Sequence, residues 1–268
     1  MSLVLGYAGR VLQSIAIWLW LVVGLLLNYP IALLLWLLTN SFDPDRRLVH
    51  WWASFWGLQF FANPGWRLTV RRRSLIKNGK PYVLVANHGS IADIGVLFPL
   101  FRQFKWVAKE EVFHIPIVGW AMRHAAYVPV RRGDRSSVEE MFRQCRHWLD
   151  RRISILMFPE GSRSPDGRIR DFKPGAFVLA REKKVPVVPI VVVGSDTILP
   201  KHSFWFRGRS RIIVEVLPPM GPGGFDSAEA FAQSVRQVMV ARHRELLMEL
   251  PEEDRLYLRE QEARTRPR

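Results

Sequence analysis

Two hydrophobic patterns divide the chain near residue 66. Before this point, no Asp, Glu, Lys or Arg occurs between Arg10 and Asp43, and the segment is almost continuously apolar. After it, short apolar runs alternate with longer amphipathic segments. The short runs predict strands at 67–72, 82–86, 105–107, 126–130, 153–158, 187–193 and 211–217. The longer segments predict helices at 91–101, 116–124, 134–151, 174–183 and 226–249.

This alternation predicts an α/β fold in layers, with a largely parallel sheet flanked by helices. No repeat with a period of roughly 20 to 50 residues is present, which argues against a solenoid. We expect three regions. Residues 1–65 form an N-terminal, membrane-anchoring helical motif, residues 66–250 form the α/β domain, and residues 251–268 form a charged tail that is either a solvated helix end or disordered.

The N-terminal apolar segment is longer than one straight membrane span requires. As a helix it would extend about 45 Å, whereas the hydrocarbon layer is ~30 Å thick. Pro30 offers a break, so the segment fits either a tilted or kinked span or a hairpin within one leaflet. The arginines that follow predict a domain on the cytoplasmic face, as at a bacterial inner membrane. The aromatic segment 50–66 suits the headgroup boundary or the domain core.

Composition narrows the choice of partner. There are 39 Lys and Arg residues against 24 Asp and Glu, and the net charge is +15. This surplus indicates an anionic partner, which is a membrane surface, a phosphorylated substrate or a nucleic acid. Zinc-finger spacing and RNP-like aromatic motifs are absent, so we expect no nucleic acid. The single Cys145 excludes an intramolecular disulfide, and its helical context favours packing over nucleophilic chemistry.

The first candidate site is the sequence NHGSIAD, which follows the predicted strand 82–86. Ser90 and Asp93 have the spacing of a helix start, with Ser90 as N-cap. On one interpretation Asp93 only caps the helix and His88 is a loop residue. On the other, one helical turn brings Asp93 back to His88, where it holds one imidazole nitrogen and leaves the other to accept a proton.

The second candidate site is the sequence FPEGSRS, at the end of the predicted strand 153–158. Pro159 cannot donate to a strand ladder, so the chain leaves the sheet there. Glu160 and Arg163 then form either a surface ion pair of little energetic value or part of a ligand site. Gly161 would let the backbone approach a ligand, and amides nearby would hold a developing oxyanion.

Four blocks of the sequence, in order, resemble the glycerolipid acyltransferases related to 1-acyl-glycerol-3-phosphate acyltransferase. NHGSIAD is similar to the first block and FPEGSRS to the third, with Ser162 in place of a threonine. WVAKEEVFHIPIVGW…AYVPVRRGD is similar to the second, and KVPVVPIVV to the fourth. The second block often ends Ile-Asp-Arg, so Arg132 is the better match and Arg131 leaves this assignment open. The blocks cover about residues 80–195.

The resemblance implies a membrane-bound enzyme that moves an acyl group directly from a thioester to 1-acyl-glycerol-3-phosphate, giving phosphatidic acid. Our hypothesis makes His88 the general base, with Asp93 fixing its tautomer. The acceptor phosphate would be bound by Lys109, Arg132 and Arg163. Glu160 would hydrogen-bond the glycerol backbone, and the loop with Gly161 and Ser162 would lie near the acyl carbonyl. No cofactor is expected, and the donor is either acyl-CoA or acyl carrier protein.

Other functions remain open at this stage. The acceptor could be another lysophospholipid or a lyso-ornithine lipid. A lipid hydrolase could use the same histidine and aspartate on water, but the sequence has no G-x-S-x-G motif. A non-enzymatic basic membrane protein is supported only by the net charge. No metal site is expected, because five histidines lack carboxylates or cysteines at ligand spacing; these are His114, His124, His147, His202 and His243. His50 belongs to the aromatic segment.

Overall fold

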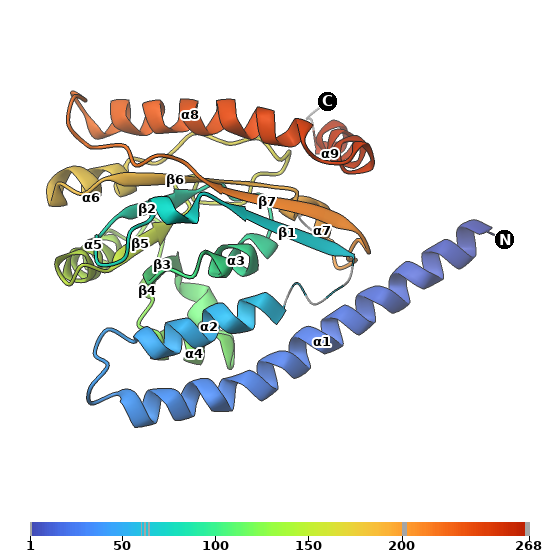
Figure 1. The fold of residues 1–268 in the computed structure, drawn as a ribbon, viewed down its shortest axis with the longest axis horizontal. Helices are drawn as coiled ribbons and strands as arrows, with labels where there is room; N and C mark the ends of the chain where they lie inside the picture. Colours follow the sequence, from blue (N-terminus) through green and yellow to red (C-terminus); the bar gives the residue numbers. More distant parts are fainter. Residues whose placement is uncertain (1, 60, 62, 64, 200–202, 266–268) are drawn as a thin grey trace.

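A mostly parallel sheet forms the centre of the molecule (Figure 1). The computed structural model describes residues 2–59, 61, 63, 65–199 and 203–265. Among these residues the strands are β1 Trp66–Arg71, β2 Val83–Ala86, β3 Phe104–Lys109, β4 Val128–Val130, β5 Ser154–Met157, β6 Val187–Val193 and β7 Ser210–Val216. They lie in the order β1-β7-β6-β2-β5-β3-β4, and every neighbouring pair is parallel except β6 and β7. The predicted fold class is confirmed.

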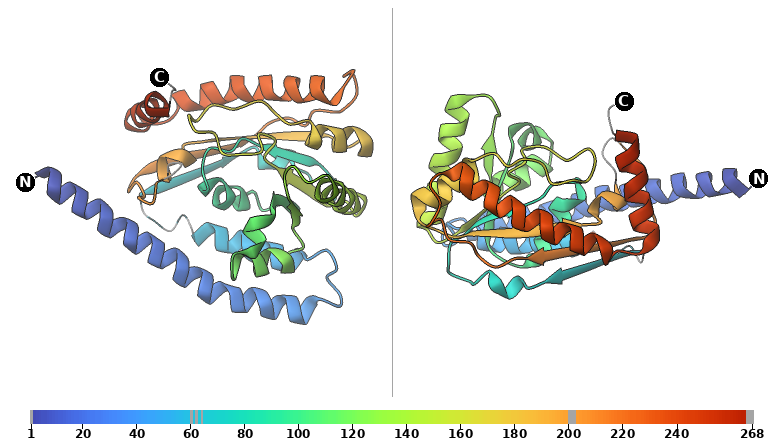
Figure 2. Two further views of the ribbon diagram at one scale, coloured as in Figure 1. Left: turned by 180° about the vertical axis from the view of Figure 1, so that it is seen from behind. Right: turned by 90° about the horizontal axis from the view of Figure 1, so that it is seen from above.

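Helices cover both faces of this sheet (Figures 1 and 2). The α-helices are α1 Ser2–Thr39, α2 Arg47–Gln59, α3 Ala92–Leu97, α4 Val118–His124, α5 Arg135–Asp150, α6 Gly175–Lys183, α7 Ser195–Ile198, α8 Ala228–Met248 and α9 Glu252–Thr265. Short 3₁₀ helices are η1 Arg73–Leu75, η2 Phe98–Leu100 and η3 Glu110–His114. Helices α5, α6 and α8 lie on one face, and α2, α3 and α4 lie on the other together with α1.

The central strands are apolar throughout because both of their faces are buried. On β2, Val83 and Val85 belong to the hydrophobic cluster beneath α5, α6 and α8. Leu84 and Ala86 alternate with them and belong to the opposite cluster, which includes residues of α2 and α3. Side chains on a strand point alternately to the two faces, so a parallel strand between two helical layers needs an unbroken apolar run. This is why the short apolar runs located the strands so well.

The N-terminal segment forms a helical hairpin against the second face of the sheet. Helix α1 runs without interruption through Pro30, so the expected break there does not occur. Side-chain bonds hold the turn before the proline: Asn28 Nδ2 donates to Gly24 O at 2.7 Å, and Trp52 Nε1 of α2 donates to Asn28 O at 3.1 Å. Helix α2 then returns along α1 (Figure 1). Packing against α2 thus supports the turn in which the proline removes one backbone hydrogen bond.

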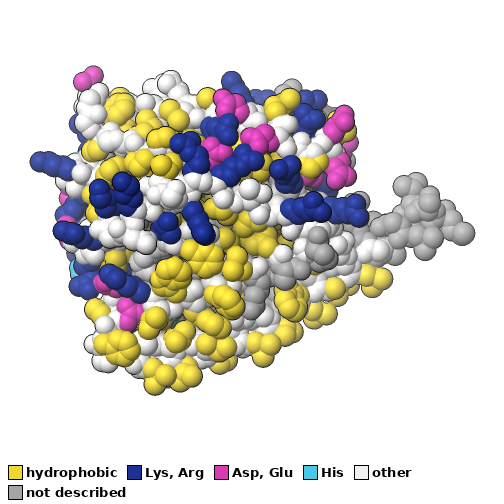
Figure 3. Space-filling view, viewed as in Figure 1, with side chains coloured by type: hydrophobic (Ala, Val, Ile, Leu, Met, Phe, Trp, Pro, Cys, Tyr) yellow, Lys and Arg dark blue, Asp and Glu magenta, His cyan; other side chains and the backbone are white. Residues whose placement is uncertain are grey.

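Helix α2 occupies most of the aromatic segment 50–66 and is amphipathic. His50 and Ser54 are buried against the α/β domain, whereas Trp51 and Phe55 are exposed. The two expectations for this segment, core packing and an exposed aromatic surface, therefore apply to opposite sides of one helix. Together with the apolar side chains of α1, the exposed residues form a wide apolar surface on this side of the molecule (Figure 3).

A buried lysine fastens the hairpin to the domain. Lys105 of β3 is fully buried, and its Nζ donates to Asp45 O in the α1–α2 turn at 2.8 Å and to Ala125 O at 2.7 Å. Burial lowers the pKa of Lys105 to about 7. On α2, His50 Nδ1 lies 3.0 Å from Tyr127 Oη. The hairpin is therefore attached at both its turn and its second helix, through partners that are far away in sequence.

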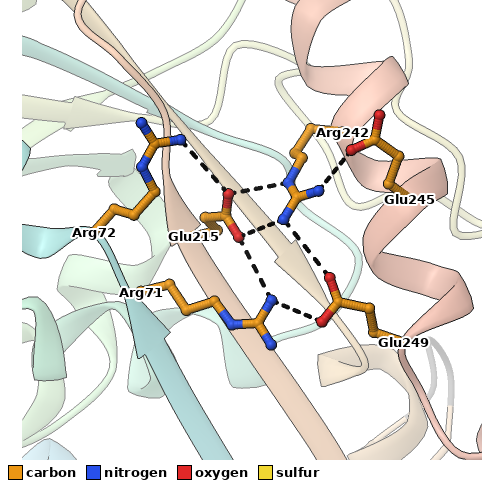
Figure 4. A network of polar contacts seen from close by, with 6 residues as sticks. All are labelled: Arg71, Arg72, Glu215, Arg242, Glu245 and Glu249. Atoms are coloured by element: carbon orange, nitrogen blue, oxygen red, sulfur yellow. Dashed lines mark hydrogen bonds and ion pairs between the residues drawn. The ribbon is translucent and has the colours of Figure 1, made fainter.

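An ion-pair network joins α8 to the edge of the sheet (Figure 4). Glu215 of β7 is buried and receives Arg242 of α8 through two bonds of 2.9 and 3.0 Å. Arg71 and Arg72, at the end of β1, lie 3.7 and 3.9 Å from the same carboxylate. Arg71 also contacts Glu249 at 2.7 Å. These two arginines therefore stabilise the edge of the domain and face α8 rather than α1.

The charged C-terminal segment is helical where the structure describes it. Helix α9 begins at Glu252, and Asp254 in its first turn is buried. Its carboxylate accepts from Arg207 at 2.8 Å and from the backbone N–H of Arg211 at 3.2 Å. The segment is thus a helix, one of the two expected states, and in its first turn Asp254 is buried rather than solvated. Charge alone could not reveal this burial, because the partners of Asp254 lie just before β7 and at its second residue.

Candidate active site

The carboxyl edge of the parallel strands collects the sequence motifs. Strands β2, β5, β3 and β4 run in the same direction and end at Ala86, Met157, Lys109 and Val130. The loops that follow therefore leave the sheet at one edge, which is where ligands bind in open α/β sheets. This edge carries every residue that the sequence proposed for the site.

His88 and Asp93 meet in the loop between β2 and α3. His88 Nδ1 lies 2.8 Å from Asp93 Oδ2, as the five-residue separation suggested. The same oxygen accepts from the backbone N–H of Gly89 at 2.8 Å and of Ser90 at 3.0 Å. Asp93 is fully buried, and with a carboxylate accepting at Nδ1, that nitrogen carries the proton. The arrangement fixes the position of the ring and its tautomer together.

The helix start differs slightly from the predicted one. Helix α3 begins at Ala92 with Ile91 as N-cap, one residue later than the Ser90 cap predicts. Ser90 Oγ accepts from Ala92 N at 3.2 Å and donates to Leu199 O at 2.9 Å. The second half of the predicted capping box is present, because the Asp93 carboxylate accepts from Ser90 N. Asp93 therefore caps the helix and holds His88 with the same oxygen.

The loop after β5 encloses the other side of His88. The Phe158 ring stacks on the imidazole with centroids 4.0 Å apart and an interplanar angle of 12°. Ser164 N donates to His88 O at 2.7 Å. The side chain of His88 keeps 17% of its surface exposed, and no residue within the described ranges hydrogen-bonds to Nε2. One ring nitrogen is thus held by the protein and the other is available to a substrate.

Glu160 links the FPEGSRS loop to the NHGSIAD loop. Its Oε1 accepts from the backbone N–H of His88 at 2.8 Å, and its Oε2 accepts from that of Arg170 at 3.1 Å. The residue is buried, and burial raises the pKa of Glu160 to about 7. Each carboxyl oxygen of Glu160 thus holds a backbone N–H group in place beside the site. Contact between Glu160 and the glycerol backbone stays a prediction.

The raised pKa of Glu160 makes stability depend on pH. Its carboxyl ionises near 4.5 when unfolded and near 7 when folded. Between these values the unfolded chain has lost a proton that the folded chain keeps, so the free energy of unfolding should decrease as pH rises from about 4.5 to about 7. Buried Asp196, whose pKa is also raised to about 7, contributes a decrease of the same sign, so in Glu160→Gln the decrease should be smaller than in wild type. Thermal unfolding in detergent across this range measures it, and equal pH slopes in both proteins would contradict the assignment.

The remaining residues of the loop follow a tight turn. Gly161 has φ +75, and its N–H donates to Phe158 O at 3.1 Å. A Cβ at this position would lie 3.0 Å from Lys173 Cε, so the lysine side chain crosses directly over the glycine. Ser162 Oγ accepts from Arg170 at 3.1 Å, and Arg163 is half-buried. The loop therefore brings several basic side chains to the edge that carries His88.

Lys109 and Arg132 lie farther along the same edge. Lys109 Nζ pairs with Glu111 at 2.7 Å, and Arg132 is exposed near the same carboxylate. Arg131 is held by Glu110 at 2.6 Å, which leaves Arg132 as the better candidate for an anion. Strand β5 lies between β2 and β3, and β5 and β3 lie between β2 and β4, so Lys109 and Arg132 belong to strand ends that are not adjacent to β2. Their role in phosphate binding stays a prediction.

Sequence reasoning missed Asp196, which follows β6 at the same edge. A Cβ on Gly89 would lie 3.6 Å from Asp196 Cβ, so this carboxyl group is adjacent to the His88 loop. Burial, followed by the proximity of Asp93, raises the pKa of Asp196 to about 7. The rule that chemistry gathers at strand ends applied equally to the strand 187–193 and could have identified it.

A metal centre or a nucleophilic cysteine would require other side chains at the site. Within the described part of the chain, no three His, Cys, Asp or Glu residues are grouped as metal ligands, and His202 lies outside the described residues. Cys145 is buried in α5, and burial raises the pKa of its thiol to about 12. A thiol of this kind is a poor nucleophile.

Comparison with known proteins identifies a matching family and similar sequences. Residues 67–193 match a family model described as Acyltransferase. A chloroplastic 1-acyl-sn-glycerol-3-phosphate acyltransferase of Arabidopsis thaliana is 35% identical over 197 residues, covering 72% of this chain and 53% of that protein. One of Chlamydomonas reinhardtii is 40% identical over 187 residues, covering 68% and 56%. The chain thus spans about half the length of these two curated relatives.

The fold is also similar to a solved structure. The crystal structure of the 1-acyl-sn-glycerophosphate acyltransferase PlsC from Thermotoga maritima aligns with a TM-score of 0.79 and 25% sequence identity. The alignment covers 90% of this chain and 97% of that one. The likeness therefore extends beyond residues 67–193, over most of this chain.

Proposed function

The chain belongs to the acyltransferase family whose model matches residues 67–193, and we propose that it transfers a fatty acyl group from a thioester to the sn-2 hydroxyl of 1-acyl-glycerol-3-phosphate. The product is phosphatidic acid. The observation that carries the proposal is the His88–Asp93 pair, 2.8 Å apart, with Nε2 of His88 open beside a basic loop. The names of the relatives support the choice of acceptor.

The proposed reaction is one direct displacement. His88 Nε2 takes the proton of the acceptor hydroxyl as its oxygen attacks the thioester carbonyl carbon. Asp93 stabilises the imidazolium that forms, through the bond at Nδ1. The carbon–sulfur bond then breaks, and the proton on His88 passes to the departing thiolate. An ester and a free thiol result, with either acyl-CoA or acyl carrier protein as donor, and no cofactor takes part.

The acceptor phosphate requires cations near His88. Arg163 is the first candidate, because it lies in the loop whose Ser164 N–H is bonded to His88 O. Guanidinium groups bind phosphate oxygens through two parallel hydrogen bonds. Lys109 and Arg132 would contribute from the β3 and β4 ends of the edge. We propose Arg163 as the main contact and these two as supporting charges.

Arg163→Lys is expected to raise the acceptor KM by about tenfold, the loss of one charge-assisted hydrogen bond. The donor KM should change by less than about twofold, because the donor contacts a different part of the site. Steady-state kinetics with each substrate varied in turn measures both values. Arg168→Lys is a matched control, since Arg168 lies in the same loop but is paired with Glu262. Equal increases in both KM values for Arg163→Lys would contradict the phosphate role.

The apolar N-terminal hairpin supports a membrane-bound enzyme. Within Val11–Thr39 of α1, the most apolar stretch of 18 residues has a mean hydropathy of 2.3 and is largely exposed. We propose that α1 and α2 lie within one leaflet, because both are fastened along the α/β domain rather than extending away from it. The domain would then face the cytoplasm, where a thioester donor is available. Lys and Arg side chains above the apolar surface suit anionic headgroups (Figure 3).

Acyl transfer from a labelled thioester to lysophosphatidic acid in vesicles tests the proposed function. We expect labelled phosphatidic acid to form with purified protein. Other lysophospholipids and a lyso-ornithine lipid, each offered separately, should react at a small fraction of this rate. Faster reaction with one of them would reassign the acceptor. Release of free fatty acid without an acceptor would favour a hydrolase.

A further inference from the structure

The segment between α7 and β7 presents two large exposed aromatic side chains. Phe204 has 74% of its surface exposed and Trp205 has 42%, although neighbouring Phe206 is buried. Arg207 N donates to Ile198 O at 3.0 Å and closes the base of the segment. Among its described residues, 203–206 form its tip; we call these the aromatic loop. Exposed neighbouring aromatics in a well-anchored loop indicate a binding surface.

The aromatic loop is held against α1, although the two are far apart in sequence. Trp18 Nε1 donates to Phe204 O at 2.9 Å, and Phe206 N donates to Ser14 Oγ at 2.9 Å. The rings of Trp18 and Phe206 pack edge to face with centroids 5.1 Å apart. Ser14 and Trp18 are one helical turn apart on the side of α1 that faces the loop. The loop is therefore fixed beside α1.

The aromatic loop extends the exposed apolar surface of α1. On α1, Leu12, Ile15 and Leu19 are exposed close to the turns that contact the loop. At the C-terminal end of the loop, exposed Arg67 and Arg209 line an open cleft of about 590 Å³, which Glu253 and Asp254 of α9 also line. An apolar surface continued by Trp and bordered by arginines matches the boundary between acyl chains and anionic headgroups.

The aromatic loop is also connected to the candidate active site. Ser90, two residues after His88, donates through Oγ to Leu199 O at the start of the segment. Strand β7 begins at Ser210 at the edge of the sheet where β6 ends, because the two strands are antiparallel. A contact made by the aromatic loop is therefore made at the edge that carries His88.

We propose that the aromatic loop is a second membrane contact, which places Phe204 and Trp205 in the interfacial region of the bilayer beside α1. This inference rests on the membrane association in the proposed function. The hairpin alone attaches the domain but leaves it free to tilt about the axis of α1. A contact at the edge that carries His88 removes this freedom and turns that edge toward the lipid, so that an acceptor whose acyl chain stays in the bilayer reaches His88.

Spin labels report the position of the loop directly. Native Cys145 is buried, so wild-type protein should take up no label, and Phe204→Cys provides a single reactive site. Leu19→Cys on α1 and Glu229→Cys on α8 give the lipid and water references. On vesicles of phosphatidylcholine and phosphatidylglycerol, we expect label 204 to collide more with oxygen than with a water-soluble nickel complex, as label 19 does. Label 229 should behave in the opposite way.

The outcomes separate this proposal from its premise. If label 204 behaves like label 229 while label 19 is in lipid, the aromatic loop is not a membrane contact, although the hairpin is. If label 19 is also in water, the premise fails and the proposal fails with it. If label 204 is equally shielded without vesicles, the loop binds another protein copy instead, which also overturns the proposal.

A kinetic comparison tests the consequence for catalysis. Replacing both Phe204 and Trp205 by serine should lower transfer to a long-chain acceptor in vesicles by about tenfold, as expected for loss of one or two interfacial aromatics. Transfer to a short-chain, water-soluble acceptor should stay within about twofold of wild type. Val178→Ser, on the opposite side of the sheet, is the control for loss of an exposed apolar side chain. Equal losses in both assays would overturn the proposal.

Discussion

His88→Ala is expected to lower the rate of acyl transfer by about a hundredfold to ten-thousandfold. His88 Nε2 is the proton acceptor in the proposed reaction, and general-base assistance contributes ~10²–10⁴-fold. Asp93 cannot replace it, because that carboxylate is fully buried behind the imidazole ring and engaged with backbone amides. Single-turnover transfer from a labelled thioester to lysophosphatidic acid, with purified protein on vesicles, measures the change.

The fold should survive this substitution. The bonds that fasten this loop to Glu160 and Ser164 use the main chain of His88, so alanine retains them. The substitution removes the hydrogen bond to Asp93 and the stacking contact with Phe158. Circular dichroism and vesicle binding should therefore match wild type. His147→Ala, at an exposed position of α5, is the control and should keep full activity. A His88→Ala enzyme that transfers acyl groups at the wild-type rate would refute the assignment.

The strands and the first motif could be predicted because their signals are local. Strand 187–193 is apolar at every position and was predicted with the bounds of β6. His88 and Asp93 are separated by only five residues, less than two helical turns, so helix geometry alone suggested their contact. In both cases the residues that determine the structure are neighbours in the sequence.

The structural role of Glu160 and the proximity of Asp196 could not be read in the same way. The Glu160 carboxylate holds the backbone of His88, which is 72 residues away along the chain. Asp196 reaches Gly89 only because β6 pairs with β2. Contacts of this kind depend on the order of strands in the sheet. Local pattern predicts that each strand exists but does not predict its neighbours.

The N-terminal segment shows how packing overrides a local signal. Pro30 normally favours a break or a kink in a helix. Here α2 packs along α1, and Trp52 donates to Asn28 O in the turn before the proline. The same docking explains why the aromatic segment that begins at His50 became a helix with one buried and one exposed side. Its buried positions are set by a domain surface that the segment's own sequence does not encode.

Asp93→Asn is expected to lower kcat by about a hundredfold to a thousandfold, with little change in the acceptor KM or the fold. All three donors to Asp93 converge on Oδ2, so an amide oxygen in the same position accepts all three bonds. The reversed amide would point its NH₂ at the N–H groups of Gly89 and Ser90, which disfavours that orientation. The substitution thus removes the negative charge while keeping the tautomer of His88. The rate falls because the imidazolium formed in the transition state loses its counter-charge.

Comparing Asp93→Ala with Asp93→Asn separates the effect of the lost negative charge from the effect of losing the position of His88. Asp93→Ala removes the acceptor as well, so the N–H groups of Gly89 and Ser90 lose a buried partner and the imidazole is free to turn. Its free energy of unfolding should be lower by about 2–4 kcal/mol, and its kcat should approach that of His88→Ala. Denaturant unfolding and single-turnover rates on the same preparations measure both. If Asp93→Asn keeps wild-type kcat while Asp93→Ala loses only stability, Asp93 serves as a helix cap alone. His88 would then act without a charged partner, and the proposed mechanism would have to be abandoned.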